Sequence, residues 1–206
     1  MNHLAHFHLS HGNDGLMIGA LLGDHIKGPL IGQWPKPWEQ GIYLHRHIDA
    51  FTDRHPALAE QRKRFNTEFY RYSSIMLDVI FDHFLSRHWQ QFHSTPLSDF
   101  SEQTYALLSQ QTLPQKAQEH AKRLAHYNQL NCYHGWQAVD ATLKRIGQRF
   151  KRSNPLAGAG NELLAHYSSL ELLFLTFYPE LQQMAKKKRQ QFDNTKPDIP
   201  EPTISE

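Results

Sequence analysis

Several residue types that mark particular protein classes are scarce in this chain of 206 residues. Cys132 is its single cysteine, which excludes a disulfide framework and a four-cysteine zinc site and is typical of a reducing compartment such as the cytoplasm. The net charge is only +2, so overall charge gives no reason to expect binding to nucleic acid or to a membrane surface. Apolar stretches such as 170–178 are too short to span a bilayer, and we expect no secretion signal.

Strand-forming residues are scarce as well, with 2 valines against 25 leucines, and apolar residues recur at helical spacing. The sequence therefore predicts an all-α fold with a single helical domain over residues 1–190. Residues 191–206 contain three prolines and few apolar side chains, which predicts a disordered tail. The predicted helices are 16–27, 38–53, 56–72, 74–92, 98–111, 114–127, 132–150 and 161–178, the last extended to about 191.

Histidine is the residue that the chain has in excess. There are 15 histidines, and 11 of them lie in the first 93 residues together with six of the ten aspartates. They gather in four places: the N-terminal His3, His6, His8 and His11; Asp24 and His25; the segment 45–49 with Asp53; and the segment 78–88. For His6 and His8, a metal ligand and a merely packed side chain are both compatible with the sequence.

Helical spacing brings some of these residues to one face. His45 and Asp49 are four positions apart, and so are Asp78 and Asp82, which lie in an otherwise apolar run. Two neighbouring carboxylates repel each other unless a cation or a proton lies between them, and mixed His and Asp ligation suits manganese, iron or zinc. The alternatives are a solvated stripe or arginine-paired carboxylates at 78 and 82, and a surface ion pair involving Arg46. The residues alone thus indicate a helical, metal-dependent hydrolase.

The same segments resemble a known family. Residues 77–89 above all, and also four shorter stretches, are similar to the acyl carrier protein phosphodiesterases; the stretches are 1–9, 19–24, 41–49 with Thr52 and Asp53, and 177–179. The resemblance implies hydrolysis of the phosphodiester between 4′-phosphopantetheine and a serine of holo acyl carrier protein. It also implies a divalent metal, typically manganese (Mn²⁺), and a distant relationship to the helical HD-domain phosphohydrolases. In contrast to the latter, this chain has no adjacent His-Asp doublet; the nearest is the reversed Asp82-His83.

With this resemblance as a guide, we assign roles to eight residues that share the segments above. The expected metal ligands are Asp24, His45, Asp78 and Asp82. Asp49 or His83 is the expected general acid/base or the group that orients a ligand, and Arg46 and Arg87 are expected to hold the phosphodiester oxygens. An ion pair with a nearby aspartate is the alternative for both arginines.

The implied partner, acyl carrier protein, is small and strongly acidic, which predicts a local basic surface. Three clusters qualify: Lys144, Arg145, Arg149, Lys151 and Arg152; Arg62–Arg64; and Lys186–Arg189. The alternative for each cluster is a charged helix face that contacts only solvent. No nucleic-acid or membrane partner is expected. Two other functions stay open: an HD-like hydrolase of nucleotides or another small phosphodiester, and a non-catalytic adaptor that binds the carrier protein.

Overall fold

The computed structural model describes residues 1–194 and confirms the all-α prediction, because this range contains helices and no strand. Most of the predicted tail, residues 195–206, lies outside the described residues, whereas 191–194 belong to the last helix. The elements are α1 (His3–Ser10), α2 (Asp14–Leu22), α3 (Lys36–Arg54), α4 (Pro56–Arg64), a 3₁₀ helix (Thr67–Tyr72), α5 (Ser73–Arg87), α6 (Trp89–Phe92), α7 (Leu97–Ser109), α8 (Gln115–His126), a 3₁₀ helix (Cys132–His134), α9 (Trp136–Gly147), a 3₁₀ helix (Pro155–Gly158), α10 (Ala159–Ala165) and α11 (Tyr167–Asn194).

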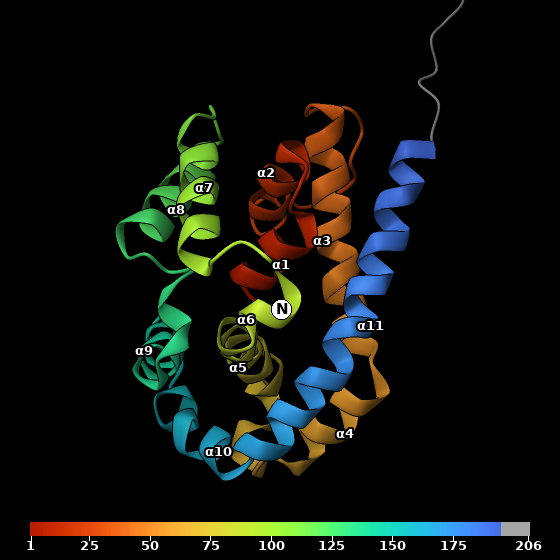
Figure 1. Cartoon of the computed structure of the whole chain (residues 1–206). Helices are drawn as coiled ribbons and strands as arrows, with labels where there is room; N and C mark the ends of the chain where they lie inside the picture. Colours follow the sequence, from red (N-terminus) through yellow and green to blue (C-terminus); the bar gives the residue numbers. More distant parts are fainter. Residues whose placement is uncertain (195–206) are drawn as a thin grey trace, which may run out of the picture.

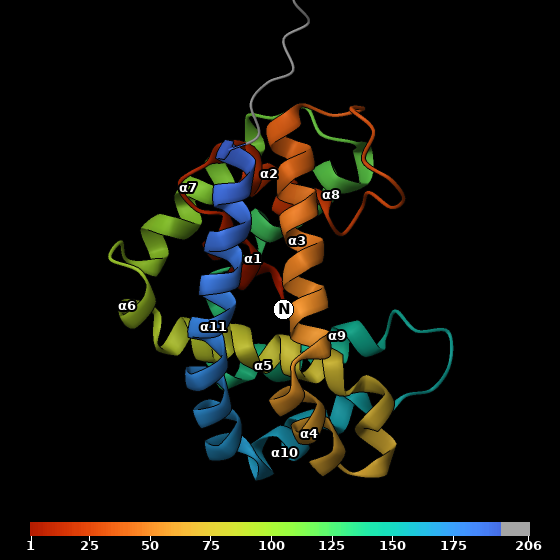
Figure 2. The same cartoon turned by 90° about the vertical axis from the view of Figure 1, so that its right-hand side faces the viewer.

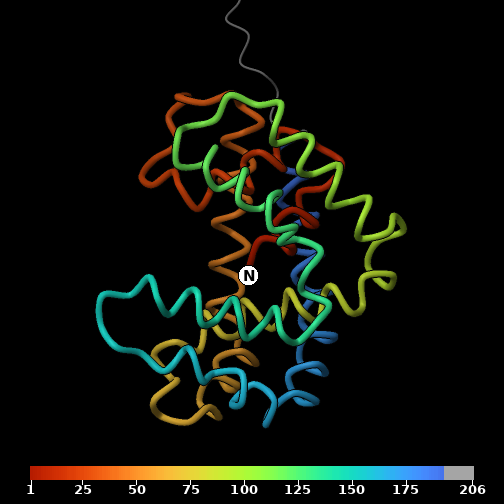
Figure 3. Tube along the Cα trace, turned by 90° about the vertical axis from the view of Figure 1, so that its left-hand side faces the viewer, coloured from red at the N-terminus to blue at the C-terminus, as the bar shows by residue number. Residues whose placement is uncertain are grey.

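The first helix, α1, lies in the middle of the molecule. In Figure 1, α2, α3, α7 and α8 form one end of the fold, and α4, α9 and α10 form the other. The long helix α11 runs beside α3 and joins the two ends, as Figure 2 makes clear. Seen from the opposite side, the N-terminus lies between the segments that contain α8 and α9 (Figure 3). Among the described elements, α1 packs against α2, α3, α5 and α11.

The helices α2 and α3 pack unusually closely because two glycines face each other. A Cβ atom on Gly19 would collide with the backbone of Trp38 and Gly41, and one on Gly41 would collide with the backbone of Leu16. This close approach fixes how far α3 stands from α2. It thereby sets the position of the side chains that α3 directs toward α1.

A layer of aromatic residues holds α5 against α11. Met76, Ile80 and Phe84, which are four positions apart, are fully buried in α5. Phe84 packs against Phe174 of α11, with ring centroids 5.9 Å apart, and Phe174 also contacts Phe81 at 5.5 Å. Burying each such ring contributes on the order of 2 kcal/mol, so α5 is a firmly held platform beneath α1.

Several predicted helices are shorter or interrupted in the structure, and α1 itself was not among the predictions. The helix predicted over 56–72 is interrupted because the backbone and side-chain amides of Asn66 both donate to Glu162 of α10 at 2.7 Å. The helix predicted over 74–92 breaks at His88, between α5 and α6. Neither of these two interruptions has a proline or glycine at the break, so the local sequence did not signal it.

Three other predicted helices differ as well. The helix predicted over 16–27 ends at Leu22, and the one predicted over 132–150 consists of a 3₁₀ helix followed by α9. The helix predicted from 161 to about 191 breaks at His166, between α10 and α11.

Candidate metal centre

His45 and Asp49 project from the same face of α3 toward α1. Nε2 of His45 lies 3.2 Å from Oδ2 of Asp49, as the four-residue spacing predicts. His45 is only 5% exposed, so this face of α3 is covered by the rest of the fold. The pair therefore combines a buried imidazole with a carboxylate whose side chain is 42% exposed.

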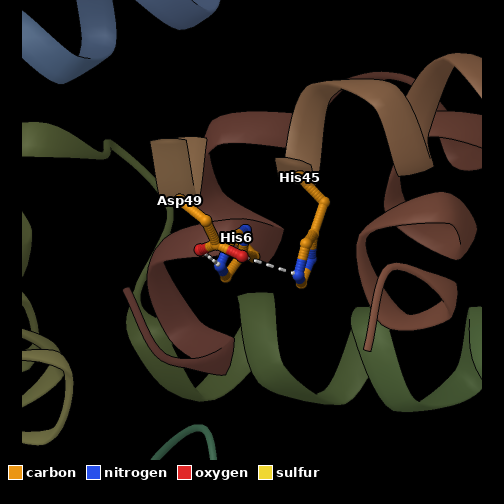
Figure 4. Close-up of side chains that lie close together, drawn as sticks. All are labelled: His6, His45 and Asp49. Atoms are coloured by element: carbon orange, nitrogen blue, oxygen red, sulfur yellow. Dashed lines mark ion pairs between the residues drawn. The ribbon is translucent and has the colours of Figure 1, made fainter. Parts of the chain in front are cut away.

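His6 of α1 completes this cluster from the other side. Its Nε2 lies 3.1 Å from Oδ1 of Asp49, and its ring stacks on that of His45 with centroids 3.9 Å apart. Figure 4 shows both imidazoles converging on the one carboxylate. One potential ligand atom from each of the three residues lies within 4.8 Å of the others, the arrangement that a metal ion requires.

Hydrogen bonding gives His45 the orientation of a metal ligand. Its Nδ1 lies 2.8 Å from the carbonyl oxygen of Ala20, which can only accept, so Nδ1 carries the proton. Nε2 of the same ring faces Oδ2 of Asp49 and, at 3.8 Å, Oδ1 of Asp24. Either a proton on Nε2 or a cation between these groups makes the contacts favourable. A backbone carbonyl on the other nitrogen is the usual support of a ligating histidine.

The local sequence makes room for this ring. A Cβ atom on Gly23, the residue that ends α2, would collide with the imidazole of His45. No larger residue fits at position 23 without moving the ring. The glycine is thus part of how the site is built, although it contributes no ligand atom.

The protonation states of the cluster suit metal binding. Burial lowers the pKa of His6 to about 4, so its ring is neutral at physiological pH. Burial opposes ionisation of Asp49, but hydrogen bonds from His45 and His6 outweigh this effect, and the pKa of Asp49 lies well below its usual range. Nδ1 of His6 is buried and has no hydrogen-bond partner among the described residues. Neutral imidazole and ionised carboxylate are the forms that bind metals.

Two further aspartates border the cluster. Asp24 follows α2, and its Oδ2 lies 3.6 Å from Nδ1 of His3. Asp78 of α5 lies on the other side of Asp49, where its Oδ1 is 2.7 Å from the amino group of Met1. That amino group is also 3.7 Å from Asp49. The positively charged amino group of Met1 therefore forms ion pairs with both Asp49 and Asp78.

Asp82 has a different environment from Asp78. It is completely buried, and its two oxygens accept the backbone N–H groups of Leu4 at 2.8 Å and Ala5 at 3.2 Å. These N–H groups belong to the first turn of α1, which its own N-cap residue, Asn2, does not cap with a side chain. The structure thus puts Asp82 behind α1, as the anchor of the helix that carries His6.

The remaining three assigned residues lie outside the cluster. Arg46 donates to the carbonyl oxygens of Gly28 at 2.8 Å and Ile26 at 3.0 Å and so holds the loop after α2. His83 contacts the carbonyl oxygen of Tyr133 and the hydroxyl of Tyr167. Arg87 is exposed at the end of α5. The structure therefore brings together Asp24, His45, Asp49 and Asp78 of the eight.

A cavity of about 440 Å³ opens beside the cluster, within the range of small-molecule sites. Asp24 and Asp78 line one side, together with His3 of α1. His120 of α8 contacts His3 at 3.2 Å and His25 at 2.9 Å, which forms a row of three imidazoles along the wall. The cavity is large enough for a slender substrate and reaches the aspartates that border the cluster, whereas His6, His45 and Asp49 are not among its lining residues.

Neither His3 nor His6 was assigned a role in the site from the sequence. Their signal was present as three-residue spacing, which places them one turn apart on a helix. It went unused because α1 was not expected to be a helix. Without that helix, no face could be assigned on which the N-terminal histidines gather.

Comparison with known proteins decides the family. The family model described as acyl carrier protein phosphodiesterase matches residues 1–181. The chain belongs to this family. A Yersinia pestis protein named acyl carrier protein phosphodiesterase is 35% identical over 192 residues, which cover 92% of this chain and 100% of that protein. Proteins of the same name from Salmonella agona and Escherichia coli are 34% and 35% identical, and each alignment covers 91% of this chain and 99% of the relative.

These matches confirm the resemblance drawn from the sequence motifs. No solved structure matches the chain significantly, so the relationship to HD-domain phosphohydrolases stays a prediction. Among the described residues, no helix combines the length and the apolar character needed to cross a membrane.

Proposed function

We propose that this phosphodiesterase hydrolyses, with a divalent metal, the phosphodiester that joins 4′-phosphopantetheine to a serine of holo acyl carrier protein. The products are apo acyl carrier protein and free 4′-phosphopantetheine. Family membership supports the substrate. The observation that supports the metal dependence is the convergence of His6, His45 and Asp49, whose potential ligand atoms lie within 4.8 Å of one another, with Asp24 3.8 Å from His45. The single cysteine supports a cytoplasmic location.

The donor set fits a divalent cation. His6, His45 and Asp49 would hold it, with Asp24 as a further carboxylate beside His45. Two imidazoles with carboxylates suit manganese, iron or zinc, and the family resemblance favours Mn²⁺. When bound, the cation supplies Lewis-acid chemistry, which makes water more acidic and offsets negative charge on the phosphoryl oxygens.

Two aspartate side chains have further roles in the proposed reaction. In the reaction, the oxygen of a water molecule forms a bond to phosphorus, the bond from phosphorus to the serine oxygen breaks, and the serine leaves with a proton. Asp78 lines the cavity and, at 35% side-chain exposure, is open to it, so we assign it as acceptor of the proton from water. Burial raises the pKa of Asp78, which brings it closer to that of an effective base. Asp82 acts as a positioning residue because it anchors α1 and hence His6.

Mass spectrometry of holo acyl carrier protein tests the proposal. Incubation with the enzyme and Mn²⁺ should remove the mass of phosphopantetheine, and excess chelator should stop this until Mn²⁺ is added back. Persistent turnover in chelator would overturn the metal dependence. An unchanged holo protein that nevertheless binds the enzyme would favour the adaptor function, and turnover of nucleotides alone would favour the HD-like alternative.

A further inference from the structure

Three arginines line the same cavity as the two aspartates. Arg145 and Arg149 come from the end of α9 and the residues after it, and Arg123 comes from α8. Asp24, after α2, and Asp78 of α5 also line it. The cavity therefore presents carboxylates, next to the proposed metal centre, together with guanidinium groups.

None of these guanidinium groups is neutralised by the fold. Arg145 donates to the hydroxyl of Thr142 at 3.1 Å, and within the side chains that the structure describes no carboxylate forms an ion pair with any of the three. Arg62 behaves differently: it lies 3.8 Å from the carboxylate of Asp53 and donates to the carbonyl oxygen of that residue. Unpaired guanidinium groups that share a cavity are typical of an anion site.

The formal charges around the cavity are of both signs. Arg123, Arg145 and Arg149 are the lysine or arginine residues among its lining, and Asp24 and Asp78 are the carboxylates. An anion that enters the cavity can therefore meet three guanidinium groups.

The basic cluster of residues 144–152 thus separates into two parts. Arg145 and Arg149 line the cavity, whereas Lys144, Lys151 and Arg152 line a depression on the outer side, around Phe150. Only the inner pair can meet a small ligand beside Asp24 and Asp78. The outer residues can meet only a molecule that covers the surface.

We infer that Arg123, Arg145 and Arg149 form the binding site for the phosphate group of the substrate, and hold it against the metal centre. This inference rests on the proposed function for the identity of the phosphate ester. The phosphodiester of the substrate and the phosphate monoester of the product 4′-phosphopantetheine are both negatively charged, and guanidinium groups bind phosphate oxygens in a planar, two-pronged manner. The arrangement assigns the phosphate-binding role to arginines other than Arg46 and Arg87.

Binding of 4′-phosphopantetheine, measured by calorimetry in the presence of Mn²⁺, tests the inference without turnover. The double variant Arg145→Gln/Arg149→Gln should bind it at least about tenfold more weakly, because each charge-assisted hydrogen bond to phosphate is worth about that factor. Arg149→Lys should retain part of the affinity. The control Lys122→Gln/Arg64→Gln removes the same charge at exposed positions outside the cavity and should bind like the wild type.

Two further measurements distinguish failure of this inference from failure of the proposed function. Mn²⁺ affinity, followed by electron paramagnetic resonance, should be the same in the double variant and the wild type; a parallel loss would mean that the arginines support the metal centre and would overturn the inference. Wild-type phosphopantetheine affinity in the double variant would also overturn it, even if holo acyl carrier protein is hydrolysed. Arginine-dependent binding without hydrolysis of the carrier protein would instead leave the phosphate site standing and refute the proposed function.

Discussion

Asp82 and Leu4 lie 78 positions apart in the sequence, and Oδ2 of the aspartate accepts the backbone N–H of Leu4 at 2.8 Å. The second oxygen of Asp82 accepts the N–H of Ala5. A side chain of α5 thus performs the capping that α1 does not perform for itself. The position of His6 relative to Asp49 depends on this contact.

Replacing Asp82 by alanine should therefore destabilise the protein and weaken metal binding together. Two backbone N–H groups would be left buried without acceptors, at a cost of about 2–4 kcal/mol in the free energy of unfolding. Urea unfolding and Mn²⁺ titration measure the two effects. Glu102→Ala, at an exposed position of α7, is the control and should change neither. A variant as stable as the wild type would show that α1 does not need this cap.

Asp82 also predicts a pH dependence of stability. Burial raises the pKa of Asp82 to about 7, although the N–H groups of Leu4 and Ala5 lower it. The unfolded chain has the ordinary value near 4, so the fold favours the protonated side chain. Its contribution is present below about pH 4 and is lost as pH rises through 7, at up to about 1.4 kcal/mol per pH unit.

Asp82→Asn cannot titrate and is the reference for this effect. The free energy of unfolding of the wild type, minus that of the variant, should fall between pH 4 and pH 7. Chemical denaturation at a series of pH values gives this difference directly. A difference that stays constant across the window contradicts the raised pKa.

The metal centre predicts a contrast between two histidines of α3. His45→Ala should lower Mn²⁺ affinity by more than about 100-fold, because the ring supplies one of the converging ligand atoms. His47→Ala is the matched control: this ring contacts the carbonyl oxygen of Tyr43 on its own helix and is not part of the cluster. Calorimetry with each variant measures the difference. Equal affinities would remove His45 from the ligand set.

The outer basic residues predict an effect on the protein substrate. Lys144→Glu/Lys151→Glu should raise KM for holo acyl carrier protein and flatten its dependence on salt, because surface charges act mainly on the encounter with an acidic partner. Steady-state kinetics at several ionic strengths measures both quantities. Phosphopantetheine binding should be unchanged, since neither lysine lines the inner cavity. An unchanged KM would show that these lysines contact only solvent and not the carrier protein.

The sequence predicted the helical fold and half of the candidate site, for identifiable reasons. His45 and Asp49 lie on one helix, so their spacing alone brings them together. The different environments of Asp78 and Asp82 could not be predicted, because spacing gives a shared face but not which residue meets the N–H groups of another helix. In the sequence, Arg145 and Arg149 belong to one basic cluster with their neighbours. Only the tertiary structure shows that these two arginines line the cavity and that Lys144, Lys151 and Arg152 do not.

The shortness of α1 has a consequence for how the centre opens. A helix of eight residues is too short to persist alone in water, so α1 exists only while it is docked on α5. Each undocking takes His6 away from Asp49 and exposes the amide protons of Leu4 and Ala5 to deuterium exchange. A cation that binds His6 together with Asp49 opposes that motion. Two amide protons that touch no ligand atom would thus report, through their exchange rates, whether the centre is filled.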